Sequence, residues 1–152
     1  MLIDQIKSDL KQAQLNRDEI KLQALRMLLS EAKYSKISSR DEGESADDIS
    51  DDQVMVVAQK EVKKRNEAAV SFRQGGRDDL AQKEEAEAQI LKQYLPVQMS
   101  TLELTTIIEE VVKELGASTQ SDMGKVIGAV RAKVGAKADG ATISGIVKEK
   151  LS

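Results

Sequence analysis

The last part of the chain, residues 122–151, decides the fold prediction, and it reads Asp122-Met-Gly-Lys-Val-Ile-Gly-Ala-Val-Arg-Ala-Lys-Val-Gly-Ala-Lys-Ala-Asp-Gly-Ala-Thr-Ile-Ser-Gly-Ile-Val-Lys-Glu-Lys-Leu151. Apolar residues recur at helical spacing on both sides of a glycine-bounded turn, which predicts short helices over about 122–134 and 141–151. Gly124 and Gly128 fall inside the first helix, although an exposed helical glycine costs roughly 1 kcal/mol relative to alanine. A reason other than helix stability is therefore expected for them.

The same helical periodicity continues towards the N-terminus, and the chain has one proline and no β-branched alternation. The fold class predicted is all-α, with an N-terminal four-helix part followed by a small C-terminal three-helix bundle. Leu95-Pro96 ends the fourth helix, because the residue before a proline disfavours the α region. The predicted domains are 1–96, an N-terminal helical domain, and 97–152, a C-terminal three-helix domain.

Several local signals predict where the other helices begin. Capping boxes are recognised at Ser50-Asp-Asp-Gln53 and Ser100-Thr-Leu-Glu103, and Asn16 is expected to cap the second helix. The polar segment between Ser38 and Asp52 is too hydrophilic to pack, and it predicts a mobile loop.

The composition excludes several kinds of chemistry. The chain contains no cysteine and no histidine, so it can form no disulfide, no Cys/His zinc site, no thiol nucleophile and no imidazole base. We predict no catalytic residue, no metal and no cofactor. No signal-peptide core and no run of roughly 20 apolar residues is found, so a soluble cytoplasmic protein without membrane contact is expected.

The formal net charge is −3, but the charge is unevenly distributed. Residues 122–152 carry six lysines and arginines against three acidic residues, which makes this end of the chain locally positive by three. The excess is modest and much smaller than that of a polybasic arm.

On a helical wheel, Met123, Ile127, Val130 and Val134 form the core side of the helix over 122–134. The opposite side is formed by Gly124, Gly128 and Ala132, flanked by Lys125 and Arg131. Such a smooth, cation-edged strip allows another backbone to approach closely, whether a protein helix or a sugar-phosphate chain. Packing of the strip against the N-terminal part, or simple tolerance of glycine, explains the pattern equally well.

The turn after this helix is a candidate anion site. Backbone N–H groups at Gly135, Gly140 and the start of the last helix are expected to be exposed, and Lys137 adds positive charge. Asp139 is interpreted as the helix cap rather than as a catalytic acid.

Two other features favour plainer interpretations. In Lys60-Glu-Val-Lys-Lys-Arg65, Glu61 and Arg65 are spaced to form an i,i+4 pair, so this stretch is expected to be a solvated helix face. The chain has only two tyrosines and one phenylalanine, too few for a base-stacking platform. If RNA is bound, we expect recognition of its shape and backbone.

Seven segments, in this order, give the chain a family resemblance: Leu25-Arg-Met-Leu28, Lys60-Glu-Val-Lys-Lys-Arg65, Gly76-Arg-Asp-Asp-Leu80, Tyr94-Leu-Pro96, Asp122-Met-Gly-Lys-Val126, Ala138-Asp-Gly140 and Ile146-Val-Lys-Glu149. The chain resembles the YqeY family over essentially its whole length. That family is similar in turn to the C-terminal tail of the GatB subunit of Asp/Glu-tRNA amidotransferase.

The resemblance implies a tRNA-binding or amidotransferase-associated accessory protein whose tail grips the outer corner of tRNA. An amidotransferase or an aminoacyl-tRNA synthetase is the implied protein partner. Carried over residue by residue, the implied RNA contacts are Gly124, Lys125, Gly128, Lys133, Lys137, Asp139, Gly140 and Lys148. The family more often shows arginine at the position of Lys137, and lysine keeps the charge but lacks the bidentate fork.

The resemblance also brings an association with carbon-nitrogen ligase activity that uses glutamine as amido-N-donor. The chain lacks the amidase signature and a Walker-type phosphate loop, so catalysis by the chain alone is not expected. Two alternatives remain open at this point. One is a helical protein-protein adaptor without RNA binding, and the other is a free-standing amidotransferase.

Overall fold

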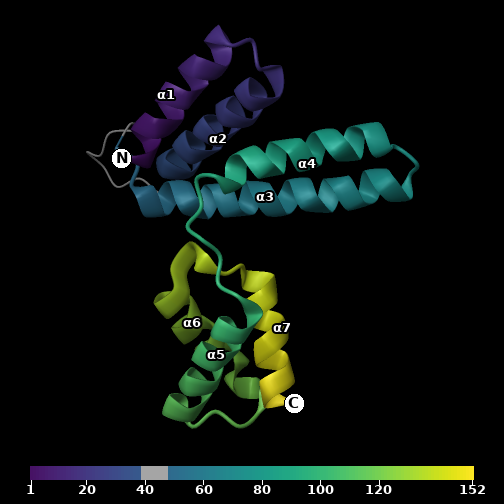
Figure 1. Ribbon diagram of the computed structural model, residues 1–152. Coiled ribbons are helices and arrows are strands. Elements are labelled where there is room, and N and C mark those ends of the chain that lie inside the picture. Colours follow the sequence, from purple (N-terminus) through teal and green to yellow (C-terminus); the bar gives the residue numbers. More distant parts are fainter. Residues whose placement is uncertain (39–47) are drawn as a thin grey trace. The chain divides into compact units, whose positions relative to one another are not determined.

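The computed structural model describes residues 1–38 and 48–152 (Figure 1). All regular structure in these two ranges is helical and no strand occurs in them, so the predicted all-α class is confirmed. The loop predicted between Ser38 and Asp52 falls mainly on 39–47, which lie outside the described residues.

The chain divides into two compact units, which we call unit 1 (Met1–Leu95) and unit 2 (Pro96–Ser152). Whether they are the separate domains expected over 1–96 and 97–152 stays a prediction. The helices of unit 1 are α1 (Leu2–Leu15), α2 (Glu19–Ser38), α3 (Asp51–Gln74) and α4 (Asp78–Lys92). Those of unit 2 are α5 (Thr101–Leu115), the short 3₁₀ helix η1 (Gln120–Asp122), α6 (Met123–Val134), the 3₁₀ helix η2 (Gly135–Lys137) and α7 (Gly140–Leu151).

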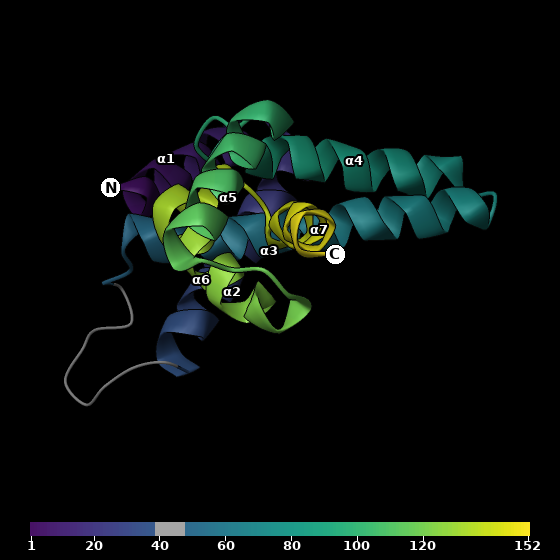
Figure 2. The same ribbon diagram turned by 90° about the horizontal axis from the view of Figure 1, so that it is seen from below.

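Unit 1 consists of two helical hairpins, α1–α2 and α3–α4, whose paired helices lie side by side (Figure 1). Figure 2 shows α3 and α4 side by side from a second direction. Its core is apolar, and the side chains of Ile6, Leu25 and Leu91 are fully buried. The hydroxyl of Tyr94 donates a 2.6 Å hydrogen bond to the carboxylate of Asp9. Burial and this bond raise the pKa of Tyr94 above its usual range. The bond links the segment directly after α4 to α1.

A buried group of charges joins α3 to α4. The guanidinium of Arg65 donates to the carboxylate of Glu87 at 3.1 Å and to that of Glu61, and the three residues are 6–8% exposed. The expected Glu61–Arg65 pair is therefore present, but the prediction of a solvated helix face is wrong for these two residues. Glu87 belongs to α4 and is 22 positions away from Arg65 in the sequence, so local spacing could not predict this contact.

Local capping chemistry accounts for most helix ends. Both predicted capping boxes are confirmed, because the side chains of Ser50 and Ser100 accept from the backbone N–H three residues later and the box is completed in return. Asn16 is not the cap of the second helix. The chain turns through Arg17 at a left-handed φ of 54°, and the side chain of Asp18 accepts from the N–H of Lys21, so Asn16 lies at the C-terminal end of α1.

In unit 2, each α-helix contributes one apolar stripe to a common core. The buried members of these stripes are Leu104, Ile108 and Val111 of α5, Val126, Val130 and Val134 of α6, and Ile143, Val147 and Leu151 of α7. The three helices therefore hold α6 and the following turn in a defined orientation within this unit.

Candidate functional site

The glycine strip predicted on α6 lies at the surface of unit 2. Gly124, Gly128 and Ala132 are exposed, whereas Val126 and Val130 are fully buried on the other side of the helix. A Cβ built on Gly124 or on Gly128 would meet no described atom within 4 Å outside the helix's own backbone. The surface over the strip is therefore open to solvent, and no side chain of another element covers the two glycines.

Two of the cations of unit 2 are paired with α5. The ammonium of Lys133 lies 3.4 Å from a carboxylate oxygen of Glu114, and that of Lys150 lies 2.7 Å from one of Glu109. Both acids belong to α5, so both lysines extend along the sides of α6 and α7 that face this helix. Lys133, which the family resemblance implied as an RNA contact, is thus directed away from the strip.

The other cations remain available to a ligand. In the part of the chain that the structure describes, no salt bridge involves Lys125, Arg131, Lys137 or Lys148, and all four are exposed. Lys125 follows directly after Gly124. Lys148 lies on the exposed side of α7 together with Ala141 and Gly145. These two neighbours resemble the glycine strip, because one has a small side chain and the other has none. The unpaired positive charge therefore flanks surfaces of low relief.

Asp122 fixes the entry into α6. Its carboxylate accepts the backbone N–H groups of Ser118 at 3.1 Å and Thr119 at 3.2 Å. These bonds hold the pKa of Asp122 below its ordinary value of 3.8, and the nearby Lys125 charge adds a smaller contribution. The start of the glycine-bearing helix is thus anchored by a carboxylate in its charged form.

The turn from α6 to α7 has the geometry of a capped helix start. Gly135 has a φ of 55°, a left-handed conformation that side chains disfavour. The carboxylate of Asp139 accepts the N–H of Thr142 at 2.7 Å and its hydroxyl at 2.9 Å, which confirms the predicted cap. Since both oxygens are engaged in this cap, Asp139 shapes the turn, and Lys137 supplies its positive charge.

Gly140 has a role that the sequence analysis did not find. A Cβ at this position would lie 2.0 Å from Nη2 of Arg131, so the missing side chain leaves room for the guanidinium at the start of α7. The sequence predicts Gly140 in an anion site and Arg131 only at the edge of the strip. The last turn of α6 brings the arginine back over the loop, and this return is a tertiary contact without a sequence signature.

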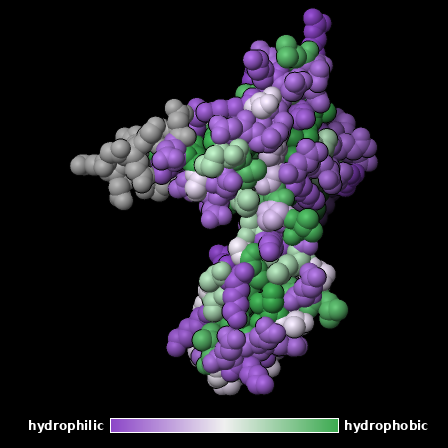
Figure 3. Space-filling view, turned by 60° about the vertical axis from the view of Figure 1, so that its left-hand side comes forward, coloured by the Kyte–Doolittle hydropathy of each residue, from purple (hydrophilic) through white to green (hydrophobic). Residues whose placement is uncertain are grey.

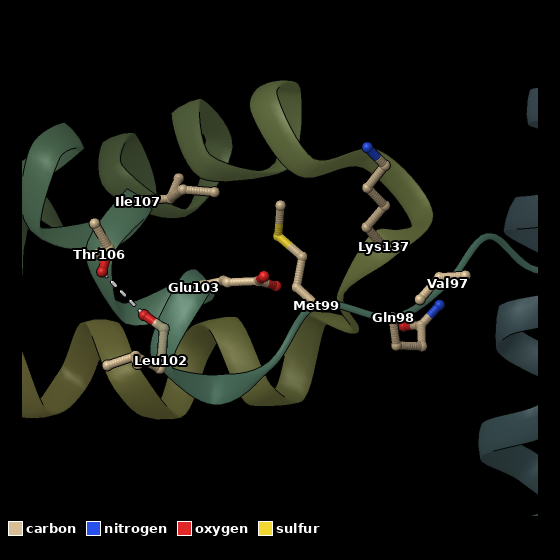
Figure 4. A pocket seen from close by; sticks show the side chains of 8 residues that line it. All are labelled: Val97, Gln98, Met99, Leu102, Glu103, Thr106, Ile107 and Lys137. Carbon is tan, nitrogen blue, oxygen red and sulfur yellow. Dashed lines mark hydrogen bonds between the residues drawn. The ribbon is translucent and has the colours of Figure 1, made fainter.

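An open hollow of about 690 Å³ lies beside the same turn. Its apolar lining includes Val97, Met99, Leu102 and Ile107, and Lys137 borders it. Figure 4 shows the side chain of Met99 between Glu103 and Lys137. In the space-filling view, hydrophobic side chains show among hydrophilic ones on the visible face of this unit (Figure 3). Val97 and Leu102 are 92% and 78% exposed, which is unusual for large apolar side chains.

The predicted site residues therefore fall into separate sets. Gly124, Lys125 and Gly128 share one face of α6. Lys137, Asp139 and Gly140 share the turn, Lys148 lies further along α7, and Lys133 is paired with α5. Among the described residues, no cluster of three or more potential metal ligands occurs, and no helix is long and apolar enough to cross a membrane.

Similar proteins are found in fungi. The chain is 38% identical over 90 residues to the protein named "Altered inheritance of mitochondria protein 41, mitochondrial" of Eremothecium gossypii, covering 59% of this chain and 46% of that protein. It is 32% identical over 120 residues to the Saccharomyces cerevisiae protein of the same name, covering 79% and 61%. An uncharacterized protein of Schizosaccharomyces pombe is 34% identical over 97 residues, covering 64% and 74%.

The chain thus spans about half of the length of the Eremothecium protein and somewhat more of the Saccharomyces protein. Both are named as mitochondrial proteins, and this finding overturns the expectation of a cytoplasmic protein. That expectation rested on the lack of sorting and membrane signals in the sequence, and such a lack does not identify a compartment.

A family model supports the resemblance that was drawn from seven short segments. The model described as "Yqey-like protein" matches residues 3–151, which is nearly the whole chain and includes both units. The chain therefore belongs to the family of YqeY-like proteins.

Proposed function

We propose that unit 2 binds folded tRNA through the glycine strip of α6 and the unpaired cations beside it. The observation that carries this proposal is the open space over Gly124 and Gly128, next to an unpaired Lys125. A phosphate backbone can approach a helix closely only where side chains are absent, and lysines beside that approach neutralise its charge.

The electrostatics of unit 2 support the same proposal. Acidic residues of α5 neutralise Lys133 and Lys150, and apart from Lys113 of α5 itself the cations left over in unit 2 lie on α6, in the turn and on α7. With few aromatic residues in the chain, contacts with phosphates and sugars are the expected mode, so the shape of the RNA is recognised rather than its bases. Such binding weakens steeply with salt, because counterions are released from the RNA.

The experiment is fluorescence anisotropy of labelled bulk tRNA with the full chain, at a low and at a physiological salt concentration. Wild type is expected to bind in a salt-sensitive manner, and a variant with Lys125→Ala and Lys137→Ala is expected to bind much more weakly. The matched control carries Lys7→Ala and Lys11→Ala on the exposed side of α1, which removes the same charge from unit 1. Equal losses in both variants would reduce the effect to net charge and count against the site.

We propose further that the chain acts as an accessory to an amidotransferase or an aminoacyl-tRNA synthetase and does not catalyse alone. The resemblance of the tail to that of GatB supports an association with amide transfer to tRNA, and a chain without cysteine or histidine offers few groups for glutamine hydrolysis. Purified chain with glutamine, ATP and tRNA should release no ammonia above background. Release at a substantial rate would establish a free-standing enzyme instead.

The second candidate function is a helical protein adaptor, and the apolar hollow beside Lys137 favours it. Large apolar side chains that stay exposed next to a hollow are typical of protein interaction sites. This function predicts that addition of the chain leaves the anisotropy of the labelled tRNA unchanged at both salt concentrations. It also predicts that Leu102→Asp abolishes capture of a defined protein partner.

A further inference from the structure

Helix α2 bears a second exposed apolar surface, which the tRNA proposal does not use. Its core side carries buried residues such as Leu25 and Leu28. On the opposite side, Ile20, Met27 and Tyr34 are 40%, 46% and 70% exposed. These three residues are spaced by seven, so they lie almost directly above one another on the helix.

The spacing places the residues on either side of this row in a heptad register. With Ile20, Met27 and Tyr34 at position a, position d is taken by Gln23, Ser30 and Ile37, which are all exposed. We call these residues the α2 stripe: Ile20, Gln23, Met27, Ser30, Tyr34 and Ile37. Position a is thus apolar throughout, whereas at position d only Ile37 is apolar. An exposed row of period seven suits the narrow seam between two paired helices, and polar residues within such a seam set its register at a cost in stability.

The charges beside the α2 stripe indicate what covers it. Arg26 occupies position g and Glu31 the following position e, and neither side chain forms a salt bridge among the described residues. In a parallel pair of helices, g of one copy lies next to the e that follows five residues later in the other. Arg26 would therefore meet Glu31 of a second copy, and the two-fold axis repeats this contact.

An antiparallel arrangement lacks this complementarity. It places g beside g and e beside e, so Arg26 and Glu31 of the two copies are kept apart. The parallel arrangement also stacks Gln23 on its own copy, where two amides can bond to each other and set the register at some cost in stability. The charges therefore favour one orientation and one register.

We propose that two copies of this chain associate through their α2 stripes as a parallel, two-fold symmetric dimer. The seam would hold Met27 and Tyr34 against their equivalents, with reciprocal Arg26–Glu31 pairs on both flanks. Unit 2 takes no part in this contact, so the inference does not depend on the tRNA proposal.

The first test is the oligomeric state of the full chain by sedimentation equilibrium over a wide concentration range. The expected mass rises from 16.6 kDa towards twice that value. Arg26→Glu should weaken dimerisation by about tenfold or more, because it replaces two attractive contacts by two repulsive ones. Adding Glu31→Arg to this variant should restore the dimer, since the pair is then reversed. Wild type that stays monomeric throughout, or no recovery in the double variant, overturns the proposal.

The second test uses the fact that the chain contains no cysteine. Ser30→Cys places one thiol at a d position, where two parallel copies bring their Cβ atoms close enough for a disulfide. Mild oxidation should convert this variant to a covalent dimer. Ser71→Cys, at an exposed position of α3 outside the α2 stripe, is the matched control and should stay monomeric. Equal cross-linking of both variants overturns the parallel seam, and circular dichroism verifies that each variant is folded.

Discussion

Charged residues are placed differently in the two units of this protein. Unit 1 buries Arg65, Glu61 and Glu87 between α3 and α4, whereas no charged residue of unit 2 is buried. In unit 2, the charged side chains lie at the surface, and part of the positive charge has no carboxylate partner. Three charged side chains of unit 1 thus help to hold α3 against α4, whereas the charged side chains of unit 2 are accessible to a ligand.

The physical cost of the two arrangements also differs. A buried arginine between two carboxylates is stable only while all three are together, since each has given up its hydration. Exposed pairs such as Lys133–Glu114 contribute little, because water and salt screen them. Exposed ion pairs can therefore be lost or exchanged at little cost to folding, whereas the buried group of Arg65, Glu61 and Glu87 cannot.

The largest expected effect comes from removing the buried cation. Arg65→Ala leaves the carboxylates of Glu61 and Glu87 buried without a counter-charge, and loss of about 3–5 kcal/mol of unfolding free energy is expected. Urea unfolding followed by circular dichroism measures this loss.

The control for this prediction is Arg73→Ala, which breaks an exposed ion pair with Glu85 on the same two helices. Its unfolding midpoint should stay close to that of wild type. If both variants lose the same stability, the buried location of Arg65 has no special importance and the contrast between the units disappears.

An intermediate effect of opposite sign is expected on the glycine strip. Gly124→Ala and Gly128→Ala add methyl groups into open space, so each should stabilise unit 2 by roughly 1 kcal/mol through helix propensity. If the strip contacts RNA, the same variants should bind tRNA more weakly than wild type. Thermal unfolding and tRNA anisotropy of the same samples provide the two readings.

Gly145→Ala is the matched control, because it also points into open space but lies on α7. It should stabilise the protein similarly and retain more of the affinity for tRNA than the α6 variants. Stabilised α6 variants with unchanged affinity for tRNA would leave the glycines without a part in binding.

The smallest expected effect is a pH dependence of unit 2. Because backbone N–H bonds depress the pKa of Asp122 in the folded state, its charged form stabilises the fold above the ordinary value of 3.8. This contribution is lost as the pH falls through the lower, folded pKa. Asp122→Asn should therefore be less stable than wild type at neutral pH, and the difference should shrink on acidification. Melting temperatures measured across an acid series test this, and a constant difference would contradict it.

Much of the local structure could be predicted from the sequence, because the signals are short-range. The capping boxes at Ser50 and Ser100, the glycine after α5 and the cap at Asp139 each depend on residues within a few positions of one another. The exposed strip of Gly124 and Gly128 followed in the same way from helical periodicity alone.

The errors have two sources, the local backbone conformation and the contacts with other helices. Asn16 was expected to cap α2 because its side chain suits that role, but the left-handed conformation of Arg17 moves the cap to Asp18. Val70 of α3 shows the part that other helices play, because it is apolar and yet 57% exposed. A periodic apolar residue becomes core only if another element reaches it.

The sequence by itself determined the helical class, most helix ends and the cation-edged glycine face, since each follows from interactions within one or two helical turns. Only the tertiary structure decided that Arg65 lies buried between two carboxylates, that Gly140 leaves room for Arg131, and that α5 neutralises Lys133 while Lys125 stays unpaired. These contacts join residues on different helices. Their existence depends on how the helices pack. An i,i+4 pair has the same sequence pattern on a solvent-exposed face as on a face that packs against another helix, so the pattern does not predict burial.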